Sequence, residues 1–279
     1  MRTIKAEEIT KAVSDLCIQA NIKLPQDIAR ALETAKQAET WPLSRNILDV
    51  ISENYRIAAK TQVPICQDTG MACVFIEAGQ DVHVEGNLEE AINKGVRQGY
   101  TKGYLRKSVV SDPFDRVNTK DNTPAVIYYD IVAGDRFKIT VAPKGFGSEN
   151  MSAIKMLRPS DGVDGAVDFI VNTVKNAGAN PCPPVVVGVG IGGTFDKAAY
   201  LAKKALLRNI DTPNGNPFYA ELEEKILKKL NDTGIGPQGV GGKTFALGVN
   251  IEYMPTHIAG LPVAVNINCH VTRHMTCEL

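Results

Sequence analysis

The sequence lacks the features that mark several large classes of protein. It has no Cys-x-x-Cys pair, the main signature of zinc ribbons and thioredoxin-type redox sites. Six cysteines in 279 residues are too few for a disulfide scaffold. The formal net charge is zero, because 31 basic residues balance 31 acidic ones. No overall field therefore attracts nucleic acid or an anionic membrane, and we expect neither partner.

Long hydrophobic runs are also missing. The longest apolar stretch, PPVVVGVGIGG at residues 183–193, is too short and too rich in glycine to span a bilayer. The first residues carry charges where a signal peptide needs an apolar segment. We therefore expect a cytoplasmic protein. Hydrophobic residues at 44% and charged residues at 22% are typical of a folded globular chain, and the neutral charge mildly favours an oligomer.

Helical patterning dominates the first sixty residues. Apolar residues recur at helical spacing over Ile9–Cys17, Ile28–Ala35 and Ile47–Tyr55, with Ser44 as the predicted N-cap of the third helix. Beyond residue 63 the pattern alternates between strands and helices. It predicts helices over residues 87–100, 161–176, 196–208 and 218–230, and strands over residues 72–77, 127–132, 137–141, 185–189, 245–251 and 263–267.

These elements predict a mixed α/β fold. A helical part at about residues 1–60 is expected to pack on a mixed-sheet body within a single domain of residues 1–279. Residues 127–132 and 137–141 flank Ala-Gly-Asp-Arg and predict an antiparallel hairpin.

Two glycine-rich segments raise the question of nucleotide binding. Gly188–Gly193 fits G-x-G-x-x-G after a strand and before a helix. The acid expected next, Asp211, follows no apolar strand, so tight strand–helix packing is the competing interpretation. Gly236–Thr244 resembles a P-loop but has one residue too many, and it enters a strand instead of a helix. We reject it.

Two polar segments have open interpretations. Lys144–Asn150 (KGFGSEN) could aim backbone N–H groups at a carboxylate or phosphate, or could be an ordinary tight loop. Near the C-terminus, Cys269, His270, His274 and Cys277 raise the possibility of zinc, but their order matches no common zinc spacing.

Three cysteines stand in unusual settings. Cys66 lies in a polar loop, ICQDTG, where a thiol buries little surface. Cys182 lies in NPCPP, where prolines stiffen the loop, and Cys269 directly follows an apolar strand. Iron–sulfur clusters prefer thiolates, and three ligands would leave one iron of a cubane open for Lewis-acid catalysis. The competing interpretation is three cysteines that are simply buried.

At these residues the chain resembles the α subunit of two-subunit class I (iron–sulfur) fumarate hydratases, a family shared with L-tartrate dehydratase. Five segments carry the resemblance: VPICQDTG, LRKSVVSDPFDRVNTKDNTPA, KGFGSEN, NPCPPVVVGVGIGGTFDKAA and THIAGLPVAVNINC. They follow the family's order over nearly the whole chain. The resemblance implies a [4Fe–4S] cluster on Cys66, Cys182 and Cys269, with the fourth iron free for substrate.

The resemblance also implies the residues that contact substrate. They are Gln67, Asp68, Arg106, Gly147 and His257, with Asp68 and His257 as the catalytic candidates. In the KGFGSEN loop Phe146 replaces the middle glycine of the commoner triple-glycine form. This departure from the family pattern lies directly beside Gly147. An arginine that grips a carboxylate orients the substrate and offsets charge that builds up at the adjacent carbon. Asp68 could transfer a proton or orient a neighbour.

The rival hypotheses are an electron-transfer or sensor protein and a nucleotide-dependent oxidoreductase built on Gly188–Gly193. The former needs a fourth cluster ligand, for which Cys17, Cys73 and Cys277 are the candidates. Cys17 lies on a helical stripe and Cys73 in a strand pattern.

The resemblance further implies a partner. Single-chain members of the family carry a second region with more basic residues and a catalytic base, whereas only ten residues follow Cys269 here. We therefore expect a separate β subunit that completes the active site, in a heterotetramer or another heteromer. The expected reaction is the reversible hydration of fumarate to L-malate in the tricarboxylic acid cycle, because that activity is the commoner one in the family. L-tartrate dehydration is the alternative.

Overall fold

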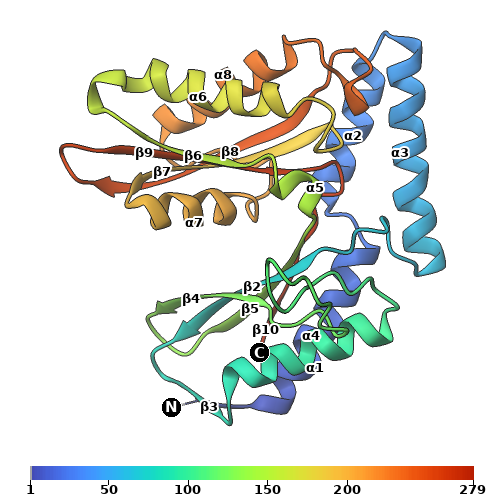
Figure 1. The fold of residues 1–279 in the computed structure, drawn as a ribbon, viewed down its shortest axis with the longest axis vertical. Coiled ribbons are helices and arrows are strands. Elements are labelled where there is room, and N and C mark those ends of the chain that lie inside the picture. Colours follow the sequence, from blue (N-terminus) through green and yellow to red (C-terminus); the bar gives the residue numbers. More distant parts are fainter. Residues whose placement is uncertain (1) are drawn as a thin grey trace. The chain divides into compact units, whose positions relative to one another are not determined.

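The computed structural model describes residues 2–279, which divide into two compact units. Unit 1 contains residues 2–24, Tyr55–Phe146 and Arg273–Leu279, and unit 2 contains Pro25–Asn54 and Gly147–Thr272. The helices and sheets confirm the predicted mixed α/β fold (Figure 1). The helices of the first sixty residues belong to different units: the first is part of unit 1 and the second is part of unit 2.

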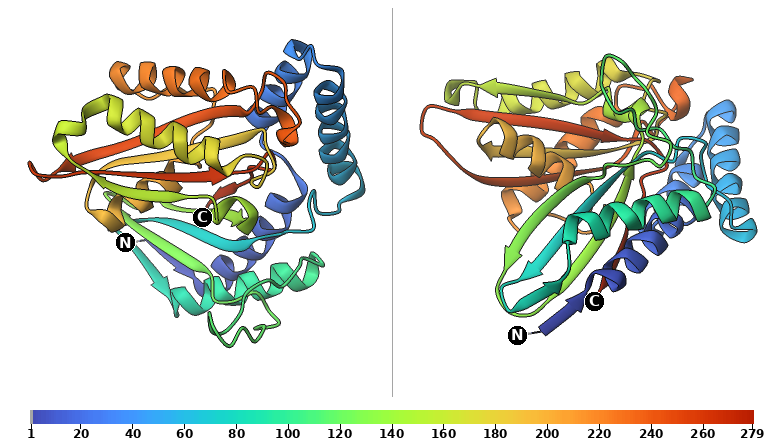
Figure 2. Two further views of the ribbon diagram at one scale, coloured as in Figure 1. Left: turned by 45° about the horizontal axis from the view of Figure 1, so that its top comes forward. Right: turned by 60° about the horizontal axis from the view of Figure 1, so that its bottom comes forward.

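Unit 1 is built on a four-stranded sheet in the order β10-β5-β2-β4, beside a two-stranded parallel sheet of β1 and β3. Its strands are β1 (Arg2–Lys5), β2 (Met71–Gly79), β3 (Val82–Glu85), β4 (Val126–Val132), β5 (Phe137–Lys144) and β10 (Met275–Glu278). Its two long helices, α1 (Ala6–Ile22) and α4 (Leu88–Lys102), lie side by side (Figure 2, right) and share one hydrophobic core with the sheet.

The predicted hairpin of residues 127–132 and 137–141 is wrong. Both strands form, but β2 lies between them, parallel to β4 and antiparallel to β5. The physical reason is burial, because β2 carries five consecutive buried residues and needs a neighbour along both edges. The connection between β4 and β5 closes over the end of β2, where Gly79 N–H donates to Arg136 O at 2.7 Å.

Unit 2 has a four-stranded sheet in the order β6-β9-β7-β8. Its strands are β6 (Ala153–Leu157), β7 (Val185–Gly193), β8 (Ala246–Thr256) and β9 (Leu261–Asn268). Helices α6 (Gly162–Ala177) and α8 (Pro217–Asn231) cover one face, and α7 (Phe195–Ala205) covers the other (Figure 1). Helix α2 (Gln26–Ala38) belongs to this unit, while α3 (Pro42–Thr61) and the short α5 (Phe146–Glu149) contain the points where the chain changes unit.

The third N-terminal helix begins earlier than predicted. α3 starts at Pro42, and Ser44 lies inside its first turn instead of capping it. The Ser44 hydroxyl donates to the carbonyl of Gly241, so a tertiary contact uses the side chain that the sequence pattern assigned to a cap. Proline is well suited to the first turn of a helix because it has no N–H group to satisfy.

The G-x-G-x-x-G segment serves strand–helix packing. Gly188–Gly193 lies within β7, and α7 crosses its glycines closely. A Cβ atom at Gly188 would lie 2.2 Å from a backbone oxygen of α7, and one at Gly190 would lie 2.0 Å from another. Only hydrogen fits at these two positions, which accounts for the glycines without a nucleotide.

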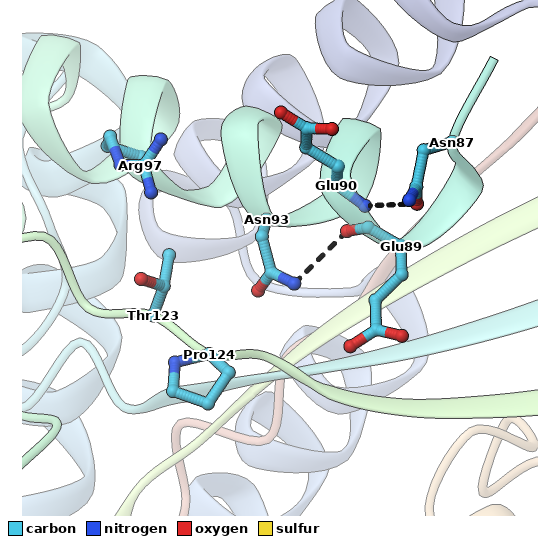
Figure 3. Close-up of a pocket in the computed structure, with 7 residues that line it drawn as sticks. All are labelled: Asn87, Glu89, Glu90, Asn93, Arg97, Thr123 and Pro124. Atoms are coloured by element: carbon cyan, nitrogen blue, oxygen red, sulfur yellow. Dashed lines mark hydrogen bonds between the residues drawn. The ribbon is translucent and has the colours of Figure 1, made fainter. Parts of the chain in front are cut away.

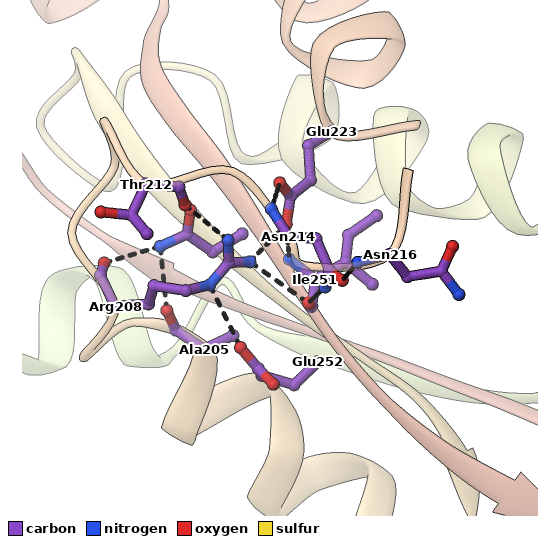
Figure 4. Close-up of polar contacts among 9 residues, drawn as sticks. Ala205, Arg208, Thr212, Asn214, Asn216, Glu223, Ile251 and Glu252 are labelled. Carbon is purple, nitrogen blue, oxygen red and sulfur yellow. Dashed lines mark hydrogen bonds and ion pairs between the residues drawn. The ribbon is translucent and has the colours of Figure 1, made fainter. Parts of the chain in front are cut away.

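A polar cluster ties the far end of α7 to α8 and β8 (Figure 4). The Arg208 guanidinium pairs with the carboxylates of Glu223 and Glu252. Glu223 is 6% exposed, and its Oε1 also accepts the Ile251 N–H at 2.7 Å. Its charge is therefore fully paired, which makes the cluster structural. Asp211, the acid considered for a nucleotide ribose, instead pairs with Arg30 of α2.

Among residues 2–279, no helix combines the length and apolar character needed to cross a bilayer.

Candidate functional site

The loop before β2 holds three of the predicted site residues in unit 1. Cys66 is half-buried, Gln67 is exposed and Asp68 is partly exposed. The Cys66 thiol lies 3.5 Å from Gln67 Oε1, within reach of a weak S–H donor. The N-terminal side of the loop is fixed to α1, because the Ile65 N–H donates to Asn21 O at 2.9 Å.

The Asp68 carboxylate joins this loop to the KGFGSEN segment. Its Oδ1 accepts the Gly70 N–H at 3.0 Å, and its Oδ2 accepts the Phe146 N–H at 3.1 Å. A Cβ atom at Gly145 would lie 3.1 Å from the same Oδ2, so the segment passes close to the carboxylate. Both carboxylate oxygens already hold backbone donors. Asp68 therefore links its own loop to the backbone at Phe146.

Arg106 is placed beside the same loop by Thr69. The Thr69 hydroxyl accepts the Arg106 N–H at 2.9 Å and donates to the Arg106 carbonyl at 3.2 Å. Thr69 is buried, whereas Arg106 is exposed. The structure therefore brings four of the predicted residues together in unit 1: Cys66, Gln67, Asp68 and Arg106. The exposed side chain of Arg106 is accessible to an anion in solution.

Cys182 and Cys269 come together in unit 2. Cys182 precedes β7, Cys269 follows the antiparallel strand β9, and Val186 pairs with Asn268. The His270 N–H donates to Cys182 O at 3.3 Å, and His270 Nδ1 lies 2.9 Å from the same oxygen. These contacts make the two cysteine loops neighbours.

Cys182 has an unusual backbone conformation. Its φ of 54° lies in the left-handed region, which costs a non-glycine residue about 1–2 kcal/mol. The residue is exposed, and its N–H donates to Ala179 O at 3.0 Å. Strain of this kind is concentrated at functional sites, where the direction of a side chain matters more than local stability.

The rest of the KGFGSEN segment belongs to unit 2 and lies beside both cysteine loops. A Cβ atom at Gly147 would lie 3.7 Å from Asn180 O. Glu149 binds the Lys203 ammonium through Oε1 at 2.6 Å and the Asn266 amide through Oε2 at 2.7 Å. Asn266 precedes Cys269 by three residues, so this network fixes the segment against the strand that ends at Cys269.

His257 lies elsewhere. It follows β8, and Thr256 of that strand pairs with Gly193 at the end of β7 farthest from Cys182. At about 3.3 Å per residue, the eight residues of β9 place His257 roughly 25 Å from Cys269. His257 is exposed and lines a largely apolar hollow together with residues of α6 and α8. Within unit 2, the structure does not bring His257 to Cys182 or Cys269.

The remaining cysteines are poor candidates for cluster ligands. Cys17 and Cys73 are 0% and 4% exposed, and burial raises the pKa of the Cys17 thiol to about 12. Burial also raises the pKa of Cys277, in β10 at the edge of the unit 1 sheet. Across residues 2–279, no group of three or more histidine, cysteine or acidic side chains is arranged as a metal site.

The sequence argument missed Arg273. This arginine is 4% exposed, and its Nη2 donates to the carbonyl of Asp68 in unit 1. Its Nε and Nη1 are buried without a hydrogen-bond partner in the described chain. A cation within four residues of Cys269 was the available signal, but burial cannot be read from the sequence.

A separate hollow in unit 1 contains none of these residues. It lies between the first turns of α4 and the segment before β4, and its polar lining includes Glu89, Asn93 and Arg97 (Figure 3). The Asn87 side chain accepts the Glu90 N–H at 3.0 Å and caps α4. Within the helix the Asn93 amide donates to Glu89 O at 3.0 Å, and Arg97 pairs with Asp121. Because these contacts are local ones, we do not assign the hollow to the candidate site.

Fold and loops together define a class: an α/β protein of two units, in which unit 1 holds Cys66 beside two arginines and unit 2 holds two further cysteines in neighbouring loops at strand ends. The comparison with known families makes this specific. The family described as fumarate hydratase (Fumerase) matches residues 10–278. The chain belongs to that family.

Individual relatives cover almost the entire chain. A Methanocaldococcus jannaschii protein named "Putative L(+)-tartrate dehydratase subunit alpha" is 44% identical over 273 residues, which are 95% of each chain. The L(+)-tartrate dehydratase subunit alpha of Escherichia coli K12 is 34% identical over 273 residues, covering 96% of this chain and 90% of the relative. The same protein of Shigella sonnei has the same identity and coverage.

Proposed function

We propose that this chain is the α subunit of an L(+)-tartrate dehydratase, a hydro-lyase that removes water from a 2,3-dihydroxydicarboxylate. The observation that carries the proposal is the naming of relatives that are 34–44% identical over nearly the whole chain. It favours tartrate over the malate–fumarate pair that the sequence alone led us to expect. Fumarate hydration is the second candidate, favoured by the description of the matching family.

The proposed cofactor is a [4Fe–4S] cluster held by Cys66, Cys182 and Cys269. Three features fit it: two of the thiols lie in neighbouring loops, all three cysteines are outside the cores, and a buried arginine lies beside the Cys66 loop. When bound through three cysteines, the cluster supplies an open iron position, which is Lewis-acid chemistry at the departing hydroxyl.

The chain's own residues bind and orient the substrate. The exposed guanidinium of Arg106 is available to grip one substrate carboxylate, and the Gln67 amide adjoins the Cys66 thiol. Elimination needs a proton to leave the carbon next to a carboxylate, and a cation on that carboxylate stabilises the charge that develops. Gly147 lies beside Asn180, two residues before Cys182. Asp68 holds the Cys66 loop against the backbone at Phe146 through its two backbone contacts.

The position of His257 has a consequence for assembly. Since roughly 25 Å separate it from Cys269 within one chain, a substrate contact by His257 requires a second copy of the chain to supply it. The proposed enzyme therefore contains at least two α chains. A separate β subunit, implied by the subunit names of the relatives, is proposed to add the remaining cationic groups and the catalytic base.

The deciding experiment is anaerobic co-expression of the chain with its cognate β subunit, followed by kinetics and by iron and sulfide analysis. We expect kcat/KM for L(+)-tartrate dehydration to exceed that for L-malate dehydration. A site that pairs the second hydroxyl should reject malate strongly, because its polar groups would remain unpaired. The reverse order would identify a fumarate hydratase, and activity in an iron-free protein would end the cluster proposal.

Serine variants test the ligand set directly. Cys66→Ser, Cys182→Ser and Cys269→Ser should each abolish the broad brown absorbance of the reconstituted protein. Cys17→Ser, Cys73→Ser and Cys277→Ser are the matched controls and should retain it. A control variant that loses the absorbance while it remains folded would point to a fourth protein ligand, as in an electron-transfer protein.

A further inference from the structure

Arg273 presents a physical problem that its protein contacts do not solve. The side chain is 4% exposed, and only Nη2 has a hydrogen-bond acceptor, the carbonyl of Asp68. Nε and Nη1 have none within residues 2–279. A guanidinium stays charged in proteins, and burying it without an anionic partner is strongly unfavourable. Two orphaned donors on a permanent buried cation indicate an anion that the protein residues do not provide.

The neighbours of Arg273 locate that anion. Its own acceptor, Asp68, follows Cys66 by two residues. The next two carbonyls of the same loop are also held from within the unit, because the Tyr100 hydroxyl lies 2.7 Å from Thr69 O and 3.0 Å from Gly70 O. Arg273 and Tyr100 thus support three consecutive carbonyls of the loop that begins at Cys66.

The covalent chain gives a second constraint. Arg273 follows Cys269 by four residues, so at most about 14 Å of extended backbone separates their Cα atoms. Arg273 is therefore tethered to one cysteine loop by the chain and hydrogen-bonded to another. Arg106, the other arginine beside the Cys66 loop, is exposed and has no such tether.

We propose that Arg273 is a positioning residue for the iron–sulfur cluster, holding the Cys66 loop through Asp68 O and directing Nε–H and Nη1–H at cluster sulfur. This inference rests on the proposed cofactor. A [4Fe–4S]²⁺ core with three thiolates carries net charge −1, so a buried cation compensates it. Hydrogen bonds to cluster sulfurs stabilise the more reduced, more negative state and raise the reduction potential.

The test uses the complete αβ enzyme reconstituted anaerobically, as wild type, Arg273→Gln, Arg273→Lys and the control Arg97→Gln. Arg97 is an exposed arginine of unit 1 that pairs with Asp121 and lies outside the site. The readouts are the midpoint potential of the cluster, the rate at which its absorbance decays in air, and KM. Arg273→Gln should lower the midpoint potential. It should also speed the decay of the absorbance about tenfold, which corresponds to the free energy of one charge-assisted hydrogen bond.

Arg273→Lys keeps the charge but loses the fork of donors, so its potential and decay rate should lie between those of wild type and Arg273→Gln. Arg97→Gln should match wild type, and KM should stay within about twofold of wild type in every variant. If Arg273→Gln fails to fold, as judged by far-UV circular dichroism of the apoprotein, the comparison of Arg273→Lys with wild type decides.

Two results would overturn the inference while leaving the cluster in place. A KM raised about tenfold or more with an unchanged potential would make Arg273 a substrate-binding residue. An unchanged potential, decay rate and KM would show that buried water satisfies the two donors. Absence of iron and sulfide from the wild-type enzyme would instead refute the proposed cofactor and this inference together.

Discussion

Asp68→Asn separates anchoring from proton transfer at the position between Cys66 and the glycine-rich segment. The wild-type carboxylate accepts one backbone N–H on each oxygen, from Gly70 at 3.0 Å and from Phe146 at 3.1 Å. Asparagine has the same shape but only one acceptor oxygen. Whichever way the amide is oriented, its NH₂ group faces a backbone N–H and one hydrogen bond is lost.

The expected cost follows from that contact. A hydrogen bond to a charged group contributes about 1.5–3 kcal/mol, and a partly exposed carboxylate falls toward the lower end of that range. For a chain of this size, the loss corresponds to a fall in melting temperature of roughly 3–10 °C. The Phe146 contact joins residues 78 positions apart, so its loss also loosens the glycine-rich segment and should lower kcat/KM.

The assay is thermal and urea unfolding of the apoprotein, with kinetics of the αβ enzyme alongside. Asp112→Asn is the matched control, because Asp112 accepts two backbone N–H groups at 2.8 Å within its own exposed turn. It should cost well under about 1 kcal/mol. An Asp68→Asn protein as stable as wild type but without activity would refute the anchoring argument and favour direct proton transfer.

Three further predictions follow from the structure. Gly190→Ala should destabilise the protein by about 1–3 kcal/mol in urea unfolding, because its Cβ would lie 2.0 Å from an α7 carbonyl oxygen, and an unchanged urea midpoint would contradict the packing argument. Partial burial raises the pKa of Asp121, but the Arg97 contact and other hydrogen bonds outweigh it and lower it to about 2. The ionised carboxylate therefore adds about 2 kcal/mol to the free energy of unfolding above about pH 4, and this contribution is lost as the pH falls toward 2. The difference in urea midpoint between wild type and Asp121→Asn should vanish over that range. Mixed assemblies of inactive His257→Ala and Cys182→Ser chains should regain activity, and none would be regained if both residues served one chain's site.

Local patterns in the sequence determined most of the secondary structure. Helices such as α1 and α4 and strands such as β7 and β9 form close to the predicted residues, because their apolar spacing, caps and glycines act over a few neighbours. The motif segments likewise identified the family, which the comparison confirmed. Cys17 and Cys73 were correctly placed in apolar elements, since their surroundings repeat at helix and strand periods.

Only the tertiary structure decided how those elements pair and what they leave buried. It inserted β2 between two strands that are adjacent in sequence, because burial along both edges outweighs the advantage of a short hairpin. It placed His257 and Cys269 at opposite ends of β9, although their numbers differ by only twelve. It also buried Arg273 with two orphaned donors, a property that depends on every residue packed around it. Sequence patterns report interactions over a few residues. Strand order, burial and the placement of site residues depend instead on contacts between residues far apart in the chain.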